Sequence, residues 1–281
     1  MRQAILITAY RDIDQLCRLV DFFDEDFSIY IHLDKKCKDD SSRLVNRDNV
    51  FLYRKFAVEW GDYRHLKAIV LLMEEALKGT ADYFHLITGS DYPTMPLIRF
   101  KAFCQEHCDD NYLEHFPLPH SEWGPEGGLN RIQYWWLRPN STRSKGAWVT
   151  RKFVNLQRRM GIKRGFNYFD GKIYGGGTYW SVSRKAVQVA VNYMVAHPDY
   201  LRRFRMTSIA EEICLPTLWV NSGLRFVNNY MRYIDWGSDG ANPQVLTEKN
   251  YDSIIASRAL FARKMQSGIS DILIKRLNAN E

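Results

Sequence analysis

The order of apolar and amphipathic segments in the first 90 residues constrains the fold of this chain more than any other feature. Four apolar runs have the length of buried strands: Ala4–Ala9, Phe27–Leu33, Val50–Tyr53 and Tyr83–Thr88. The segments Asp12–Phe23 and Leu66–Leu77 place their apolar residues at helical spacing instead. The order strand, helix, strand, strand, helix, strand is typical of an α/β fold. We therefore predict a central, mostly parallel sheet flanked by helices.

The remainder of the chain is less regular, but six further segments have a structural signature. We predict a glycine-rich loop at 124–128 and a basic helix at 149–160. A glycine turn that leads into a strand follows at 173–182, and a second helix at 183–194. The last two segments are a strand at 231–236 and a third helix at 250–262. Cations at 263 and 264 follow the third helix, where they complement its dipole. Because no internal repeat or linker interrupts the sequence, a single domain over 1–281 is the simplest count.

Three of the four predicted strands end in polar side chains. These ends are Thr8-Ala-Tyr10, His32-Leu-Asp34 and Thr88-Gly-Ser-Asp91. Ligands of parallel α/β sheets bind beyond the carboxyl ends of the strands, so this pattern suits a nucleotide held by loop side chains. The chain contains neither G-x-G-x-x-G nor G-x-x-x-x-G-K-[ST], which argues against dinucleotide and P-loop sites.

Two adjacent carboxylates, Glu211 and Glu212, open a short apolar helix within 208–219. Ser208 stands three residues before Glu211, which is the spacing of a capping box, so Glu211 has a structural role available. Glu212 would project beside Leu215 and Trp219, where a carboxylate needs a specific reason to lie. We consider Glu212 a candidate catalytic residue; the alternative is a solvated side chain on an ordinary helix.

Positive charge is concentrated in one segment. The chain has a formal charge of +7, and residues 131–164 contain ten Lys or Arg and no Asp or Glu, so the rest sums to −3. Trp135, Trp136 and Trp148 lie within this basic segment. Such a segment binds nucleic acid, an anionic membrane surface or an anionic or sugar-like substrate, or it is simply a solvated basic face.

The cysteines and the hydropathy pattern bear on the compartment. Five cysteines without scaffold spacing predict free thiols and a reducing environment. The opening segment Gln3–Thr8 is too short for a signal peptide, and no apolar run approaches the ~18 residues of a membrane span. We therefore expect a cytoplasmic protein.

Taken together, these stretches resemble the core-2/I-branching β-1,6-N-acetylglucosaminyltransferase family, which also contains the peptide O-xylosyltransferases. The resemblance covers nearly the whole chain in shared order and spacing. It is carried by residues 4–10, 29–36, Val58-Glu-Trp-Gly61, 82–93, Tyr174-Gly-Gly-Gly-Thr-Tyr-Trp-Ser-Val-Ser-Arg184, the Glu211-Glu212 stretch, Arg232 and Leu260-Phe-Ala-Arg-Lys264. It implies a GT-A-like fold, with a nucleotide-binding half over 1–115 and an acceptor and catalytic half over 116–281.

The resemblance also implies an activity. The family transfers a sugar from a UDP-sugar with inversion, here GlcNAc in preference to xylose, and it forms a β-linkage on a glycan or lipid-linked acceptor. It requires no cofactor and no divalent metal, and Asp24-Glu-Asp26 precedes a strand, whereas a metal-binding D-x-D should follow one. The basic pair that replaces the metal at the UDP diphosphate corresponds to Arg232 and Lys264. The catalytic base corresponds to Glu212.

Further site residues follow from the same resemblance. Thr8, Tyr10 and Asp34 would bind the uridine, although many relatives have His at the position of Tyr10. The active-site floor would consist of Asp91, Tyr92, Gly175, Gly176, Gly177 and Trp180. The acceptor region corresponds to 122–143, with Trp123, Glu126 and Arg131. Because the chain is similar to bacterial members, we also expect the basic segment to make peripheral contact with an anionic membrane or to bind an anionic acceptor.

Other functions remain open at this stage. A non-catalytic carbohydrate- or nucleotide-binding protein could use the same scaffold. A glycoside hydrolase needs two carboxylates that flank one bond, and adjacent residues on a helix are a poor pair for that geometry. Nucleic-acid binding has no recognised motif here, and we expect none.

Overall fold

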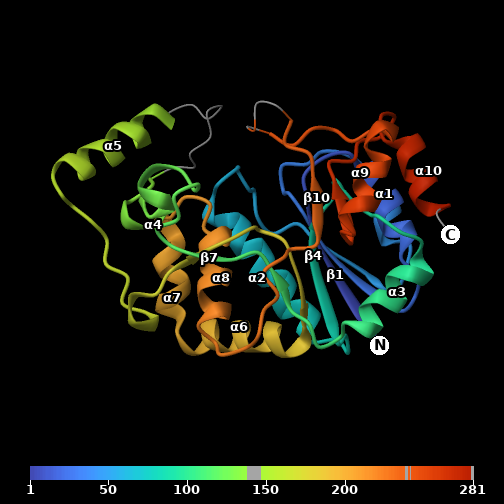
Figure 1. Ribbon diagram of the computed structural model, residues 1–281, viewed down its shortest axis with the longest axis horizontal. Helices are drawn as coiled ribbons and strands as arrows, with labels where there is room; N and C mark the ends of the chain where they lie inside the picture. The colour runs from blue at the N-terminus through green and yellow to red at the C-terminus, as the bar shows by residue number, and fades with distance from the viewer. Residues whose placement is uncertain (138–146, 238–239, 241, 280–281) are drawn as a thin grey trace.

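The computed structural model describes residues 1–137, 147–237, 240 and 242–279, and its centre is a six-stranded sheet (Figure 1). The strand order is β3-β2-β1-β4-β9-β6. These strands are β1 (Gln3–Ala9), β2 (Phe27–Leu33), β3 (Val50–Tyr53), β4 (Tyr83–Thr88), β6 (Tyr112–Leu113) and β9 (Trp180–Ser183). The first four named in that order pair in parallel, whereas β9 is antiparallel to both β4 and β6. The predicted α/β fold with a mostly parallel sheet is confirmed.

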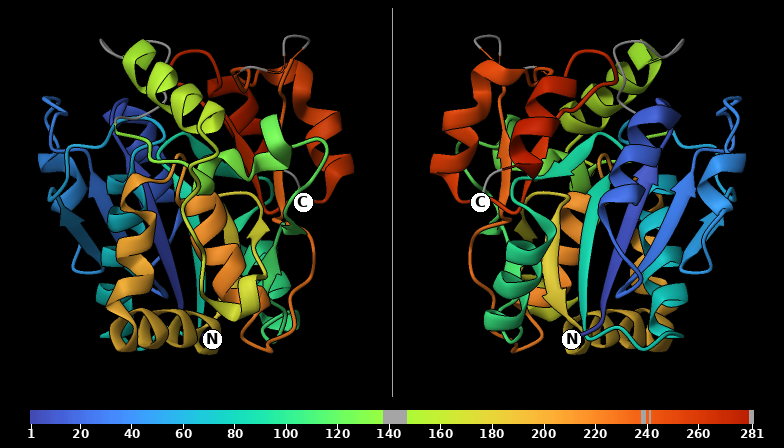
Figure 2. Two further views of the ribbon diagram at one scale, coloured as in Figure 1. Left: turned by 90° about the vertical axis from the view of Figure 1, so that its left-hand side faces the viewer. Right: turned by 90° about the vertical axis from the view of Figure 1, so that its right-hand side faces the viewer.

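Helices cover both faces of this sheet (Figure 2). One face packs against α1 (Ile13–Phe22), α3 (Leu97–Glu106), α9 (Tyr251–Ser257) and α10 (Asp271–Asn278). The other face packs against α2 (Tyr63–Leu77), α6 (Arg184–Ala196), α7 (Pro198–Arg203) and α8 (Glu211–Val220).

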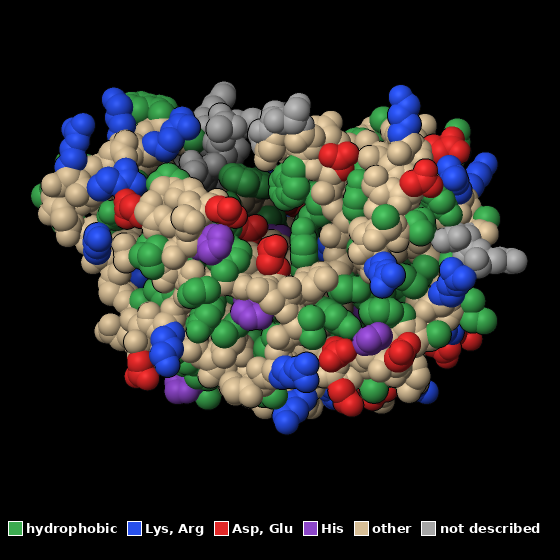
Figure 3. Space-filling view, viewed as in Figure 1, with side chains coloured by type: hydrophobic (Ala, Val, Ile, Leu, Met, Phe, Trp, Pro, Cys, Tyr) green, Lys and Arg blue, Asp and Glu red, His purple; other side chains and the backbone are tan. Residues whose placement is uncertain are grey.

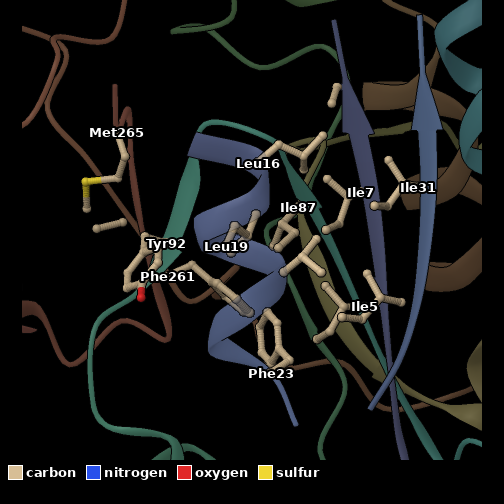
Figure 4. Close-up of a cluster of buried hydrophobic side chains, with 14 of the residues drawn as sticks. Ile5, Ile7, Leu16, Leu19, Phe23, Ile31, Ile87, Tyr92, Phe261 and Met265 are labelled. Atoms are coloured by element: carbon tan, nitrogen blue, oxygen red, sulfur yellow. The ribbon is translucent and has the colours of Figure 1, made fainter. Parts of the chain in front are cut away.

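The alternation of side chains along β1 divides the core into these two layers. Ile5 and Ile7 face α1, where they meet Leu16, Leu19 and Phe23 (Figure 4). Ala4 and Leu6 point to the opposite layer. Because successive residues of a strand face opposite sides, a strand that is buried on both faces must be continuously apolar, which explains the composition of β1.

A smaller, three-stranded sheet follows the central sheet where the chain leaves β4. It contains β10 (Arg232–Ile234), β11 (Phe261–Arg263) and β5 (Asp91–Pro93), in that order. Only two residues separate the end of β4 from the start of β5. The chain therefore passes from one sheet to the other within the predicted polar segment at 88–91.

The predicted helix over 250–262 is wrong in its second half. Helix α9 ends at Ser257, and Arg258 takes a left-handed conformation with φ 53°. The chain then extends into β11, which pairs with β10 and β5. The cations at 263 and 264 therefore follow or end a strand, and the helix dipole does not account for them.

The remaining elements are short or lie on the periphery. A two-stranded sheet joins β7 (Phe116–Pro117) to β8 (Tyr174–Gly175), and two further helices are α4 (Asn130–Gln133) and α5 (Ala147–Arg159). All five cysteines are free thiols, as predicted. Within the described ranges, no helix has the length and apolar character needed to cross a bilayer.

Candidate active site

The candidate site lies where β1 and β4 end and α8 begins. A cavity of about 320 Å³ opens between Arg11 and Asp12, which follow β1, Ser90, which follows β4, and Lys264, which follows β11; Glu212 is not among its lining residues. Its volume lies at the lower end of the range for small-molecule sites. Figure 3 also shows a hollow at the centre of one face, with acidic and hydrophobic side chains along its edge.

Glu212 lies in the first turn of α8, where polar contacts hold its side chain. Its Oε2 accepts a hydrogen bond from an Arg131 guanidinium nitrogen at 2.7 Å, and Thr178 Oγ1 donates to its Oε1 at 3.5 Å. About 26% of the side chain is exposed. The Glu212 carboxylate thus faces a cation, while Leu215 and Trp219 farther along the helix are buried in the core.

The environment of Glu212 suits proton transfer near neutral pH. Desolvation raises the pKa of Glu212 to about 7, against the opposing charge of Arg131, and the carboxylates of Glu211 and Glu114 add to the increase. A general base works best when its pKa lies near the working pH, because the ionised form is then both populated and basic. Glu212 meets this requirement.

Glu211 lies in a different, closed environment. Only 6% of its side chain is exposed, and its Oε1 lies 2.8 Å from Nδ1 of His65 on α2. The other ring nitrogen of His65, Nε2, lies 3.2 Å from Thr8 Oγ1. Burial disfavours the charged imidazole, but the neighbouring Glu211 carboxylate outweighs it and raises the pKa of His65. The Glu211 carboxylate therefore favours the charged form of His65, and the His65 side chain links α8 to β1 and α2.

The predicted capping box is wrong. Ala210 is the N-cap of α8 and makes no side-chain cap, while Ser208 is buried and donates its backbone N–H to the Arg131 carbonyl. The Glu211 side chain is turned toward His65 instead of the helix start. Sequence analysis did not identify His65, because a single histidine in the first turn of an amphipathic helix has no distinguishing pattern.

The three consecutive glycines form a floor of bare backbone beside Glu212. Gly176 donates its N–H to the Glu212 carbonyl at 3.0 Å. A Cβ on Gly176 would lie 1.9 Å from the Glu114 carbonyl oxygen, and one on Gly175 would lie 2.6 Å from the Trp123 ring. The groups that approach this backbone closely thus belong to the protein itself.

Two of the three predicted acceptor-side residues join the Glu212 cluster. The Arg131 guanidinium lies 3.8 Å from the centre of the Trp123 ring, so Trp123 positions the cation that binds Glu212. Glu126 points elsewhere and forms an ion pair with Arg158 of α5 at 2.6 Å. The part of the region beyond residue 137 lies outside the described residues.

The two cations expected at a diphosphate lie in different settings. Arg232 is 6% exposed, and burial lowers its pKa to about 10. It donates to five protein acceptors: the carbonyls of Leu86, Trp180, Tyr230 and, at 3.5 Å, Met231, and Ser181 Oγ. Arg232 thus joins β10 to the central sheet. Lys264, by contrast, lines the cavity.

Arg263 is a further cation, which the sequence analysis placed after a helix and did not assign to the site. Its Nε lies 3.3 Å from Asp91 Oδ1, and its guanidinium lies over the Tyr179 ring. Asp91 is buried beneath the site, where desolvation raises its pKa although Arg263 opposes the change. The signal that could have identified Arg263 is its position directly before Lys264.

Two other predicted floor residues belong to the hydrophobic core. The Tyr92 ring packs edge-on against Phe22 of α1, and its hydroxyl lies 3.1 Å from the Asn278 amide nitrogen. Trp180 packs edge-on against Trp219. Both side chains are fully buried.

The three residues expected at the uridine do not line the cavity. Thr8 contacts His65, while Tyr10 is exposed beyond β1. Asp34 is buried and accepts backbone N–H groups from Lys36 and Val58, one on each carboxylate oxygen. Asp34 therefore fixes the chain that follows β2, and only its second lone pairs remain for a ligand.

The acidic turn at Asp24 and Asp26 binds a lysine. Lys101 Nζ lies 2.5 Å from a carboxylate oxygen of each aspartate. In the part of the chain that the structure describes, no three His, Cys, Asp or Glu side chains are grouped in a way that could hold a metal ion.

Sequence comparison decides the family. The family model of the Core-2/I-Branching enzymes matches residues 4–255. The chain belongs to this family. The protein is thus a glycosyltransferase, as its resemblance implied, and the Glu212 cluster lies within the matched region of a Core-2/I-Branching enzyme. No curated protein matches it in sequence.

Three solved structures show low similarity to this Core-2/I-Branching enzyme. TarS from S. aureus has 18% identity and a TM-score of 0.31, over 40% of this chain and 21% of TarS, so the chain spans about a fifth of that protein. A protein from Bacillus anthracis, described as a glucose-1-phosphate thymidylyltransferase, has 9% identity and a TM-score of 0.40, over 99% and 94% of the two chains. HddC from Yersinia pseudotuberculosis has 14% identity and a TM-score of 0.31, over 67% and 79%.

Proposed function

We propose that this Core-2/I-Branching enzyme is an inverting transferase that moves a sugar from a UDP-sugar to a glycan or lipid-linked acceptor and forms a β-linkage. GlcNAc is the favoured sugar and xylose the second choice, and the reaction needs no divalent metal. The observation that best supports this proposal is the partly exposed Glu212 carboxylate, with a pKa of about 7 and a direct contact with Arg131.

In the proposed reaction Glu212 is the general base. Its carboxylate takes the proton from an acceptor hydroxyl while that oxygen attacks the anomeric carbon of the donor. The bond between this carbon and the diphosphate oxygen breaks, and UDP leaves with the electron pair. Because attack and departure occur on opposite faces, an α-linked donor yields a β-linkage. Arg131 favours the ionised carboxylate and fixes its direction.

Lys264 and Arg263 are the cations that we assign to the diphosphate. Lys264 lines the cavity beyond β1 and β4, and Arg263 precedes it at the end of β11. Fixed positive charge at this position would stabilise the negative charge that develops on departing UDP. The family's second cation, Arg232, would have to leave five protein acceptors to reach the same oxygens.

The deciding experiment measures UDP release from a panel of UDP-sugars in the presence of EDTA, with wild type and Glu212→Gln side by side. We expect turnover of one donor, and loss of turnover in the variant while UDP still raises its Tm. A requirement for Mn²⁺ would contradict the role of Lys264 and Arg263. If no UDP-sugar shifts the Tm of the wild type, the proposal fails, and a binding protein on this scaffold is the better description.

A further inference from the structure

The structure divides the basic segment 131–164 into an inner and an outer set of cations. The inner set is bound by the protein: Arg131 contacts Glu212, Arg158 contacts Glu126, and Arg164 donates to the carbonyl of Met206 at 2.8 Å. Arg138, Arg143 and Lys145 lie outside the described residues. The inner cations therefore have partners that account for them.

The outer cations lie on and just after α5, and all are exposed. They are Arg151, Lys152, Arg159 and Lys163. None of the four forms an ion pair with a carboxylate in the described part of the chain. Residues 147–164 contain no Asp or Glu at all, so this surface has a single sign of charge.

Large apolar side chains are exposed among these cations. They are Trp148, Val149, Leu156, Met160 and Ile162, with exposed fractions from 40% to 63%. At 100° per residue, Lys152, Leu156 and Arg159 share one side of the helix, with Trp148 on one flank and Val149 and Met160 on the other. The opposite side buries Ala147, Thr150, Val154 and Gln157 against the protein. Isolated exposed apolar residues are ordinary, whereas a group on one helix face marks an interaction surface.

We propose that the outer face of α5, defined by Trp148, Lys152, Leu156, Arg159 and Met160, binds the surface of an anionic lipid bilayer. Apolar side chains interleaved with cations are the composition of helices that lie in the membrane interface. The aliphatic groups enter the boundary between headgroups and acyl chains, while the ammonium and guanidinium groups meet lipid phosphates. Leu156 and Met160 would gain nothing from a nucleic acid, whose recognition relies on phosphate contacts and base stacking.

The position of α5 connects this surface to the site. The helix lies at the end of the molecule that contains the carboxyl ends of β1 and β4, away from the N-terminus (Figures 1 and 2). Arg158 on α5 binds Glu126, and the same loop region leads into α4, which contains Arg131, the partner of Glu212. A bilayer on α5 would therefore hold the acceptor side of the site near lipid headgroups. This deepens the proposed function, and rests on it, by favouring a lipid-linked acceptor.

The test is sedimentation of the full chain with vesicles of neutral phosphatidylcholine, or with about 30% phosphatidylglycerol added. Lys152→Glu/Arg159→Glu reverses the charge of the face, and Leu156→Ser/Met160→Ser removes its apolar groups. Lys172→Glu/Lys185→Glu changes the net charge by the same amount on exposed residues away from α5. We expect the wild type to prefer anionic vesicles by roughly tenfold or more at about 0.15 M salt.

The variants separate the proposal from its competitors. We expect the charge variant to lose that preference, the apolar variant to bind several-fold more weakly, and the control to bind as the wild type does. Equal losses in the α5 charge variant and the control would overturn the proposal. So would α5 variants that dissociate a dimer, measured by light scattering, without changing vesicle binding. UDP release by the same variants is measured without vesicles, so failure of the proposed chemistry would not be confused with failure of membrane binding.

Discussion

Two regions meet at the start of α8, and each surrounds one of two adjacent carboxylates. The region around Glu211 is closed, and the carboxylate binds the imidazole of His65. The region around Glu212 is open to solvent on one side, and the carboxylate binds the guanidinium of Arg131. Neighbouring residues of the same type thus have separate roles, because successive side chains on a helix point about 100° apart.

The difference explains why only one of the two can be the base. A base must reach the acceptor hydroxyl, and the closed region gives Glu211 no such access. The charge of Glu211 nevertheless acts on its neighbour, because it contributes to the raised pKa of Glu212. The closed region therefore tunes the open one through electrostatics.

Catalytic activity provides the sharpest test of this comparison. We expect Glu212→Gln to lower kcat by about 10²- to 10⁴-fold, the range attributed to a general base. Glu211→Gln should change kcat by less than about tenfold, because its carboxylate does not face the acceptor. Initial rates of UDP release with the donor found above provide the measurement. Equal losses in both variants would show that the two regions act as one unit.

Replacing Glu212 should increase the stability of the fold, although it lowers the activity. The pKa of Glu212 is about 7 in the folded protein and 4.5 in its ordinary state, so its ionisation costs folding free energy as pH rises from 4.5 to 7. Above pH 7, we expect Glu212→Gln to be more stable than the wild type by about 1–3 kcal/mol. The gain should vanish below pH 4.5. Thermal unfolding between pH 4 and 8 would reveal this gain. A variant less stable than wild type at pH 8 would contradict the free-energy cost of ionising Glu212 in the folded protein.

The closed region should show the reverse pH dependence. The pKa of His65 is raised by Glu211, so the pair stabilises the fold fully below the ordinary histidine value of 6.5 and loses this effect as pH rises through the raised pKa. Glu211→Gln should therefore be less stable than wild type by about 1 kcal/mol near pH 6, with a smaller difference at high pH. Urea unfolding at both pH values is the measurement. A deficit that grows with pH would show that His65 is neutral in the fold.

The smallest effect concerns the pH profile of activity. Arg131 lowers the pKa of Glu212 and Glu211 raises it. The acidic limb of kcat/KM should therefore move upward in Arg131→Met and downward in Glu211→Gln, each by roughly one pH unit or less. Shifts in the same direction in both variants would break the electrostatic account while leaving the identity of the base intact.

The first half of the fold was predictable largely because β1, β2 and β4 are buried on both faces. A continuous apolar run in the sequence indicates such a strand. The bounds of β2, β3 and β4 are those predicted. Strand β11 was missed because three residues are too few for a periodic pattern, and its extended form depends on pairing with β5, 168 or more positions earlier in the chain. The residues next to β11 in the sequence contain no information about this distant pairing partner.

The candidate site shows the same limit. The sequence alone indicates Glu212 as the catalytic candidate, because a carboxylate in an apolar helix is unusual and because its position matches the family. The contacts that distinguish it from Glu211 span 81 residues to Arg131 and 146 residues to His65. Arg232 matched the family pattern equally well, yet its guanidinium faces carbonyls of the central sheet. A motif thus identifies residues, whereas their direction depends on the tertiary fold.

We expect the backbone at Gly175–Gly177, which contacts Glu212, to limit how this enzyme can change its substrate. No side chain is present there to trim or exchange, and the space beyond the backbone is filled by Glu114 and Trp123. Directed evolution toward a bulkier acceptor would therefore find few useful substitutions in the floor itself. New specificity would have to arise in the walls and in the loops above them, so libraries aimed at those segments should yield more active clones than libraries aimed at the glycines.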